Sequence, residues 1–420
     1  MADIHNVITT SEGWSKIVYG GVRDLQVEHG KILDMIEFNA RNRVGSKFSE
    51  TVWITEESGV TYSGGTGVVY DLEDAVAAES EEAQGDGQEI TVRSTVSFKR
   101  LSTAVSSGEA AHGRFLTKML SNMKKTHTKR AADVIINGGS SRGTIAVGGA
   151  AGTGVTQNLT LSLASCKGCF INSRSYIDIY DSTGVTKRNA SGTFKINSFT
   201  PGASTHTLNV TAQFDTELNA VTDNDIIYFK GQKGNESTGL RSICGQTTGT
   251  YLTINAATVP EWQGNNLTVG SNMSLTKVRQ GATLAMDRGA SGEFVFLSSS
   301  KVFNHFADDI EALRQVHTPG NEMEYMGGVR RIKYYLEDDM IITFVTSTLM
   351  PDTQAVMFPT DAFERIGSTD MTMNLVGGPD DELMYNVMES KNGVEFRTYS
   401  DWLPWTTDPR SCVSFNTITP

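Results

Sequence analysis

Two segments in the first quarter of the chain alternate apolar and polar positions and are predicted to be strands. They span residues 47–54 and 90–101. The alternating apolar residues are Phe48, Val52, Ile54, Ile90, Val92, Val96 and Phe98. Between the two strands lie about 35 residues rich in glycine and carboxylates, more than a compact domain normally leaves without structure. We therefore predict a large hairpin that leaves the body of the protein and contacts another subunit.

The strongest helical pattern covers residues 109–137. Its apolar positions at helical spacing are Phe115, Leu116, Met119, Leu120, Met123, Ala131, Ile135 and Ile136. Gly138 and Gly139 follow and are typical of a helix end. At about 1.5 Å per residue this helix reaches roughly 40 Å. Its other face is basic and carries Arg114, Lys118, Lys124, Lys125, Lys129 and Arg130.

In the middle of the chain the amino-acid composition changes at residue 138, and the pattern of apolar residues changes at residue 158. Residues 138–157 are rich in Gly, Ser and Ala, a composition typical of a linker. Residues 158–232 then contain short alternating segments about ten residues apart, which predict a small all-β sandwich or barrel. Since its flanks are rich in Gly, Ser and Thr, we interpret this block as an inserted domain.

Helices and strands alternate after the inserted block, so the chain as a whole is predicted to be α+β. Helices are predicted at 274–288 and 300–316, a strand at 293–297, and a series of strands over 329–400. The apolar face of the second helix consists of Val302, Phe303, Phe306, Ile310 and Leu313. We expect that face to pack on a sheet containing Phe294 and Phe296.

Composition excludes several classes of protein. Of the 420 residues, 38% are hydrophobic and 20% charged, which is globular and not disordered. No apolar run approaches the roughly 18 residues of a membrane span, and the N-terminal residues show no secretory signal. Four cysteines are too few for a disulfide framework and are expected to be reduced. The net charge of -12 argues against a protein that binds nucleic acid over its whole surface.

The charges are distributed unevenly. Residues 48–92 hold eleven acidic groups and no Lys or Arg, and residues 93–142 hold ten basic and two acidic groups. The favoured interpretation pairs the acidic hairpin of one subunit with the basic helix of another. Loose contact of the helix with nucleic-acid phosphates, or a merely solvated helix face, are the alternatives. The interface candidates are Glu79, Glu81, Glu82, Lys118, Lys124, Lys125, Lys129 and Arg130.

No arrangement of residues in the sequence predicts chemistry. There is no HExxH, and no P-loop lysine follows the glycine-rich run at 148–154. Cys166 and Cys169 form a CxxC, but Cys244 and Cys412 are not spaced to complete a zinc site. We therefore expect no catalytic, cofactor or metal site, and no enzyme.

The order of these elements resembles the major capsid protein of tailed double-stranded DNA bacteriophages, with the Hong Kong 97-like capsid fold. The resemblance rests on residues 115–139, on the pattern of Gly239, Leu240, Ile243, Pro260 and Trp262, and on residues 292–310. The implied organisation is an N-terminal arm at 1–44, an E-loop hairpin at 45–100, the spine helix and start of the peripheral (P) domain at 101–157, the inserted β domain at 158–232, an axial (A) domain at 233–370, and strands returning to the peripheral domain at 371–420.

The resemblance also implies a function and partners. Copies of the chain would self-assemble in the host cytoplasm, as hexamers and pentamers, into the icosahedral shell of a virion. That shell would enclose double-stranded DNA and contact it non-specifically, with no membrane. A separate scaffolding protein, a portal and decoration proteins are the other implied partners. A nanocompartment shell of the encapsulin type is one alternative, and a β-rich adhesin or carbohydrate-binding protein is an alternative of another class.

Overall fold

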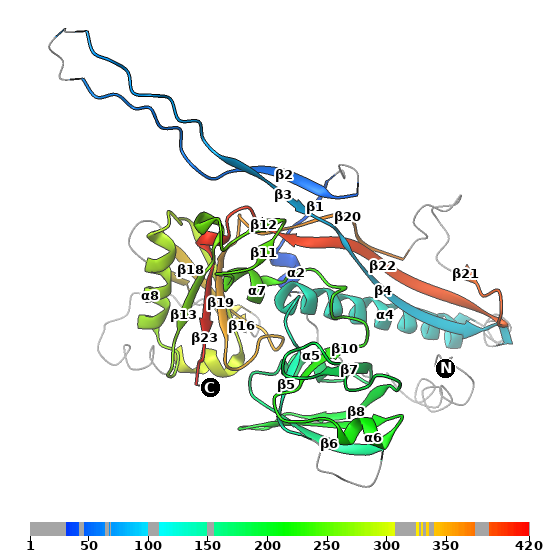
Figure 1. The fold of residues 1–420 in the computed structure, drawn as a ribbon. Coiled ribbons are helices and arrows are strands. Elements are labelled where there is room, and N and C mark those ends of the chain that lie inside the picture. The colour runs from blue at the N-terminus through cyan, green and yellow to red at the C-terminus, as the bar shows by residue number, and fades with distance from the viewer. Residues whose placement is uncertain are drawn as a thin grey trace.

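The computed structural model describes residues 31–41, 46–63, 67, 69–99, 109–148, 155–306, 325–326, 329–330, 333–335, 340–373 and 386–419. Within them a long helix lies under one sheet, a second sheet carries its own helices, a barrel stands below, and a hairpin projects from the top (Figure 1). None of the helices in these ranges has the length and apolar character to span a membrane. The short elements outside these units are α2 (Lys31–Met35), α7 (Leu240–Cys244), β11 (Thr250–Tyr251), β12 (Ile254–Asn255), β15 (Tyr325–Met326), β16 (Val329–Arg330), and the 3₁₀ turns η1 (Pro260–Trp262) and η2 (Pro409–Ser411).

The long helix α4 spans Glu109–Asn137, which confirms the predicted bounds. It packs against a five-stranded sheet made of β1 (Phe38–Ala40), β20 (Glu364–Thr372), β22 (Gly393–Trp405), β21 (Asn386–Val387) and β4 (Gln88–Ser97). Met119 and Met123 of the helix meet Val96, Val394 and Phe396 of the sheet in one buried cluster. The part of the apolar stripe around Met119 and Met123 is therefore covered by the sheet.

The second sheet has six strands in the order β13 (Asn265–Thr268), β23 (Val413–Asn416), β19 (Ala355–Pro359), β14 (Glu293–Ser298), β18 (Ile341–Thr346) and β17 (Lys333–Tyr335). Helix α8 (Leu275–Met286) and a helix over 300–306 pack on it, and both agree with the predicted positions. Phe306 is buried with its ring centroid 5.4 Å from that of Phe296, which confirms the predicted packing. The predicted continuation through Ile310 and Leu313 lies outside the described residues.

The inserted β block is a closed barrel in the order β10 (Ile226–Phe229), β5 (Gly143–Val147), β6 (Thr156–Leu161), β9 (His206–Ala212), β8 (Phe194–Thr200) and β7 (Tyr176–Tyr180), with the short helices α5 (Lys167–Phe170) and α6 (Asp215–Asn219). Strand β5 and the start of β6 lie before residue 158, in the segment interpreted as a linker. Ile145 is the one large side chain that β5 buries in the barrel, so its alternation is too weak to be read from sequence.

The projecting hairpin pairs different strands from those predicted. β2 (Phe48–Trp53) pairs with β3 (Ser80–Gly85), from Phe48 opposite Gly85 to Trp53 opposite Ser80. The predicted partner, β4, instead pairs with β22 over ten residues, from Ser97 opposite Gly393 to Gln88 opposite Trp402. Alternation of apolar and polar residues indicates which face of a strand is buried, but it does not indicate the partner strand. Strand β3 buries only Ala83, so its sequence shows no apolar alternation from which a strand could be predicted.

Candidate functional site

The hairpin extends well beyond the rest of the molecule (Figure 1). Past Trp53 the two arms of the hairpin run side by side, and the residues described there are joined by a backbone hydrogen bond from Ile54 to Glu79 and by a bridge between Ser58 and Val76. Large apolar side chains there are exposed to solvent, among them Tyr62 at 92%, Val69 at 95% and Leu72 at 78%. Exposed apolar side chains concentrated on one projecting segment mark a surface that binds another molecule.

The base of the hairpin is fixed to the body, so the projection has a defined starting direction. Arg41 joins Glu50 of β2 to Glu364 of β20, at 2.6 and 2.7 Å. The indole nitrogen of Trp405 donates to the same Glu50 carboxylate at 3.2 Å. The backbone of Gln84 in β3 donates to the carbonyl of Leu252 at 2.9 Å.

Glu79, Glu81 and Glu82 lie along the base of the hairpin with exposed side chains. Glu81 and Glu82 belong to β3, and the Glu82 carboxylate accepts a hydrogen bond from Ser49 of the paired strand. These carboxylates are accessible to another molecule, as an interface role requires. Whether a second subunit contacts them stays a prediction.

The five basic candidates on α4 separate into two groups. Lys118 and Lys124 are exposed, and Lys125 is half-buried. Lys129 and Arg130 face the barrel of their own chain. Their contacts are with Ile171, Ser175 and Phe229.

The contacts of this second group are close. The Lys129 ammonium donates to the carbonyl of Ile171 at 2.6 Å, and burial, reinforced by Arg130, lowers its pKa to about 8. Arg130 donates to the Ser175 hydroxyl at 2.8 Å and stacks on the Phe229 ring, 3.4 Å from its centroid. The inserted barrel thus takes part of the side chains of Lys129 and Arg130, and a subunit-interface role for these two residues stays a prediction.

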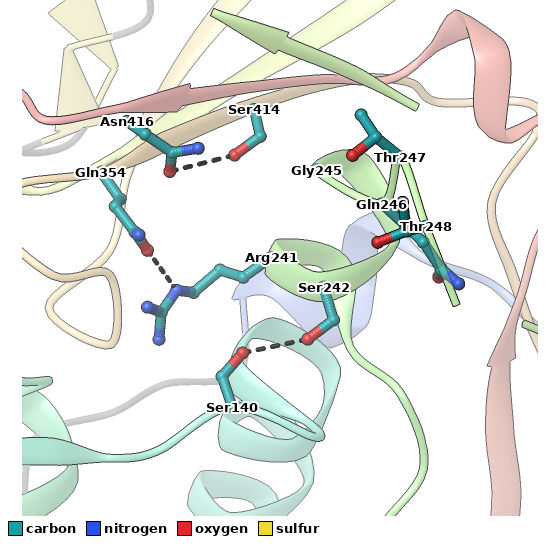
Figure 2. A pocket seen from close by; sticks show the side chains of 10 residues that line it. All are labelled: Ser140, Arg241, Ser242, Gly245, Gln246, Thr247, Thr248, Gln354, Ser414 and Asn416. Atoms are coloured by element: carbon teal, nitrogen blue, oxygen red, sulfur yellow. Dashed lines mark hydrogen bonds between the residues drawn. The ribbon is translucent and has the colours of Figure 1, made fainter. Parts of the chain in front are cut away.

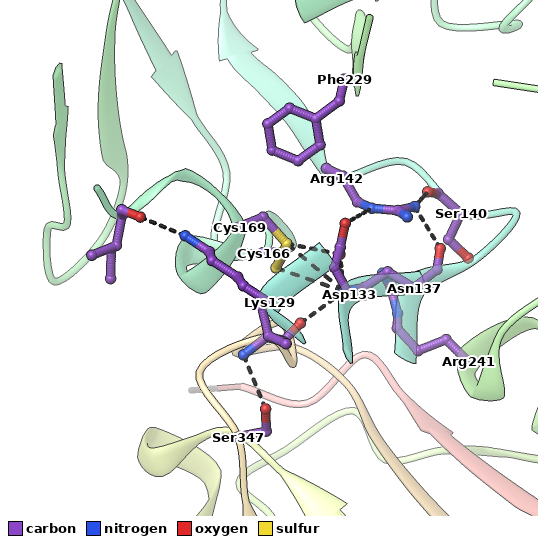
Figure 3. The surroundings of a disulfide bond; sticks show 12 residues. Lys129, Asp133, Asn137, Ser140, Arg142, Cys166, Cys169, Phe229, Arg241 and Ser347 are labelled. Carbon is purple, nitrogen blue, oxygen red and sulfur yellow. Dashed lines mark hydrogen bonds and ion pairs between the residues drawn. A yellow bond between two sulfur atoms is a disulfide. The ribbon is translucent and has the colours of Figure 1, made fainter. Parts of the chain in front are cut away.

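A buried charged junction, which the sequence reasoning missed, joins α4 to the barrel. We define it as Lys129, Arg130, Asp133, Arg142, Glu236 and Arg241. At its centre the fully buried Arg142 donates to Asp133 at 2.9 Å (Figure 3). It also donates to Glu236 at 2.5 Å. Its guanidinium also donates to the carbonyl of Asn137 at 2.7 Å.

The charge states in this junction follow from its burial. Burial alone would lower the pKa of Arg142, but Asp133 and Glu236 together raise it. Burial also raises the pKa of Glu236 to about 7, against the opposing effect of Arg142.

One pattern in the sequence could have predicted the charged junction. Asp133 and Asn137 are polar residues four apart beside the apolar positions of the predicted helix, where they need buried partners.

The expectation that all cysteines are reduced is wrong for Cys166 and Cys169, which form a disulfide beside Asp133 (Figure 3). The turn into α5 holds their Cα atoms 5.6 Å apart, within the range a disulfide needs. With Asp133 they are also the one group of potential metal ligands among the described residues. Both sulfurs are used in the S–S bond, so this group offers no thiolate to a metal.

Comparison with known proteins addresses the fold. No protein-family model matches the chain, and no curated protein matches it. The solved capsid asymmetric unit of Cyanophage A-1(L) contains a similar chain, with a TM-score of 0.55 and 12% sequence identity. The similarity covers 99% of this chain and 100% of that chain. The two chains share a fold.

Lower similarity is found to the capsid of a native GTA particle, at a TM-score of 0.45 and 8% identity over 99% of this chain and 100% of that chain. A structure of Mycobacterium phage Bobi has a TM-score of 0.43 and 10% sequence identity, over 100% of both chains. The resemblance to phage capsid proteins inferred from the sequence is thus confirmed at the level of the fold, a mixed arrangement of few helices and many strands.

Proposed function

We propose that this chain is the major capsid protein of a tailed bacteriophage, and that its copies form the closed icosahedral shell around a double-stranded DNA genome. The fold it shares with the capsid chain of Cyanophage A-1(L) supports this proposal. No reaction is assigned to the chain. Its role is mechanical, and shell strength would come from many repeated subunit contacts.

In this proposal the observed units take the parts of the Hong Kong 97-like fold. The β2–β3 hairpin and its extension are the E-loop, and α4 is the spine helix of the peripheral domain. The six-stranded sheet with α8 forms the axial domain, and the barrel is an insertion. Residues 1–44 are the N-terminal arm. Scaffolding, portal and decoration proteins would be separate chains.

The single observation that carries the proposal is the hairpin with its exposed apolar side chains. Tyr62, Val69 and Leu72 are more than three-quarters exposed on a segment that leaves the body of the protein. A solitary subunit gains nothing from such a segment, because exposed apolar surface is unfavourable in water. A shell of identical subunits offers each hairpin the surface of a neighbour.

Electron microscopy of the protein expressed with its neighbouring genes tests this function. We expect closed shells of uniform diameter that protect double-stranded DNA from nuclease. The matched control replaces residues 54–79 with a two-residue turn, which leaves the β2–β3 pairing intact. This variant should stay folded and form no shells. A folded wild-type protein that remains monomeric under all assembly conditions would contradict the proposal, and shells filled with protein and no DNA would favour the nanocompartment alternative.

A further inference from the structure

A cavity of about 400 Å³ opens beside α7, between the residues that follow the C-terminal end of α4 and strand β23 (Figure 2). Its lining holds one charged side chain, that of Arg241. The other lining side chains carry hydroxyl or carboxamide groups, apart from one glycine, and no carboxylate lines it. A polar cavity with a single cation and no anion has the composition of a site for a negatively charged ligand.

Arg241 is held in place by neutral partners only. Its Nε donates to the Gln354 side-chain oxygen at 2.8 Å, and its Nη1 donates to the Asn137 side-chain oxygen at 2.8 Å. A guanidinium has five N–H donors, so three of them have no acceptor among the described residues. The two amide contacts orient the guanidinium plane and leave the remaining donors available to a ligand.

The surrounding charges do not neutralise Arg241. The charged junction contains four cationic side chains, Lys129, Arg130, Arg142 and Arg241, and two carboxylates, Asp133 and Glu236. Both carboxylates are bound directly by Arg142. Burial, reinforced by Arg142, lowers the pKa of Arg241 to about 10. A bound anion would relieve this excess of positive charge.

We propose that the cavity binds a small oxyanion, a phosphate or a carboxylate group, through paired hydrogen bonds from the Arg241 guanidinium. The planar arrangement of guanidinium donors matches the oxygens of both groups. Thr247 and Thr248 also line the cavity and carry exposed hydroxyl groups. The volume leaves room for the molecule that carries the oxyanion. This site is independent of the proposed shell function.

Thermal unfolding of the unassembled full chain tests the site, with inorganic phosphate and sodium acetate as probes against sodium chloride at equal ionic strength. Saturating ligand should raise the melting temperature of the wild type by about 2 °C or more. Arg241→Met should lose this rise. Arg279→Met is the matched control, because it removes an exposed arginine of α8 outside the cavity, and it should keep the rise. A larger response to phosphate would assign a phosphate-bearing ligand, and a response to acetate at least as large would assign a carboxylate.

A second variant keeps the test decisive if Arg241→Met does not fold. Thr247→Glu places a carboxylate at the cavity and should occupy the site from within the chain. We expect it to have a higher melting temperature in chloride than the wild type and no response to phosphate. An equal rise in melting temperature with phosphate in the wild type and in every variant would show a general salt effect and overturn the proposal. A wild type whose melting temperature responds to neither probe would also overturn it.

Discussion

The backbone N–H of Gly239 donates to the carbonyl oxygen of Gly138 at 2.9 Å, which joins the points where the chain leaves for the barrel and returns from it. A Cβ at Gly138 would lie 2.1 Å from the carbonyl oxygen of Ser237, and one at Gly239 would lie 2.5 Å from the nitrogen of Gly138. Only glycine permits this approach. Because the two ends of the insertion touch, a whole barrel is accommodated between α4 and α7 without separating them.

Gly239→Ala should therefore destabilise the protein by about 1–3 kcal/mol or more through steric conflict. The backbone at Gly239 has φ of -98°, so the cost does not come from a left-handed conformation. Gly231→Ala is the control. It has φ of +71° and open space around it, and should cost about 1–2 kcal/mol from the backbone alone. Denaturant unfolding measures both. A Gly239→Ala variant as stable as the wild type would show that the two segments can move apart.

The barrel should fold on its own only if β5 is included. A fragment spanning 141–238 contains all six strands and the Arg142–Glu236 ion pair, and should give a cooperative unfolding transition with β-type circular dichroism. A fragment spanning 158–232 lacks β5 and part of β6. It leaves β10 and the remainder of β6 with unpaired edges, so it should be disordered or aggregate. Cooperative folding of the shorter fragment would mean that barrel closure is not required.

His127 should make stability depend on pH. Its ring nitrogens lie 3.0 Å from the Thr398 hydroxyl and 2.9 Å from the Ser400 hydroxyl, linking α4 to β22. Burial lowers its pKa to about 4, with Asp370 opposing the shift. Between pH 6.5 and 4 the unfolded chain binds a proton at His127 more readily than the folded protein does. The contribution of His127 to the free energy of unfolding is therefore fully present above pH 6.5 and is lost as the pH falls toward 4.

The loss attributable to His127 should be about 3 kcal/mol. Gln in its place offers a donor and an acceptor and does not titrate. Urea unfolding of His127→Gln at a series of pH values should therefore show a loss between pH 6.5 and 4 that is smaller by about that amount. An unchanged slope would assign the acid sensitivity to other groups.

Phe306→Ala should cost about 3–5 kcal/mol, because the ring is fully buried and leaves a cavity between Phe296 and Phe344. Phe214→Ala is a suitable control. Its ring is 44% exposed, and its loss should cost less than about 1 kcal/mol. Equal stabilities of the two variants would mean that the 300–306 helix does not pack tightly on the sheet.

Replacing Glu79, Glu81 and Glu82 with Lys should leave the subunit folded and block or misdirect assembly. Each exposed ion pair stabilises a subunit contact by only about 0–1 kcal/mol, but a shell repeats the pair at every such contact. The effect should be stronger at low salt, where charges are less screened. The charge-matched control changes three exposed carboxylates elsewhere, Glu261, Asp361 and Glu389, to Lys. Light scattering and microscopy measure shell yield. Normal shells from the hairpin variant would exclude electrostatic docking of this segment.

Local patterns in the sequence determined the elements that bury one face. The helix 109–137 was predictable to its ends, because its apolar stripe is periodic and two glycines follow it. The packing of Phe306 on Phe296 followed from a second apolar stripe next to a strand. These features depend on residues close together in the sequence, where the 3.6-residue and two-residue periods directly reflect burial.

Only the tertiary structure decided which segments meet. β4 could have paired with β2, but it pairs with β22, about 300 residues away in the chain. Lys129 and Arg130 belong to a basic helix face in the sequence, and in the structure they contact the barrel. Cys166 and Cys169 are joined because the turn at α5 brings their Cα atoms together. Apolar alternation and charge in the sequence indicate that a face must be buried or that its charges need partners. Which segment covers that face or pairs with those charges is decided by the packing of the whole chain.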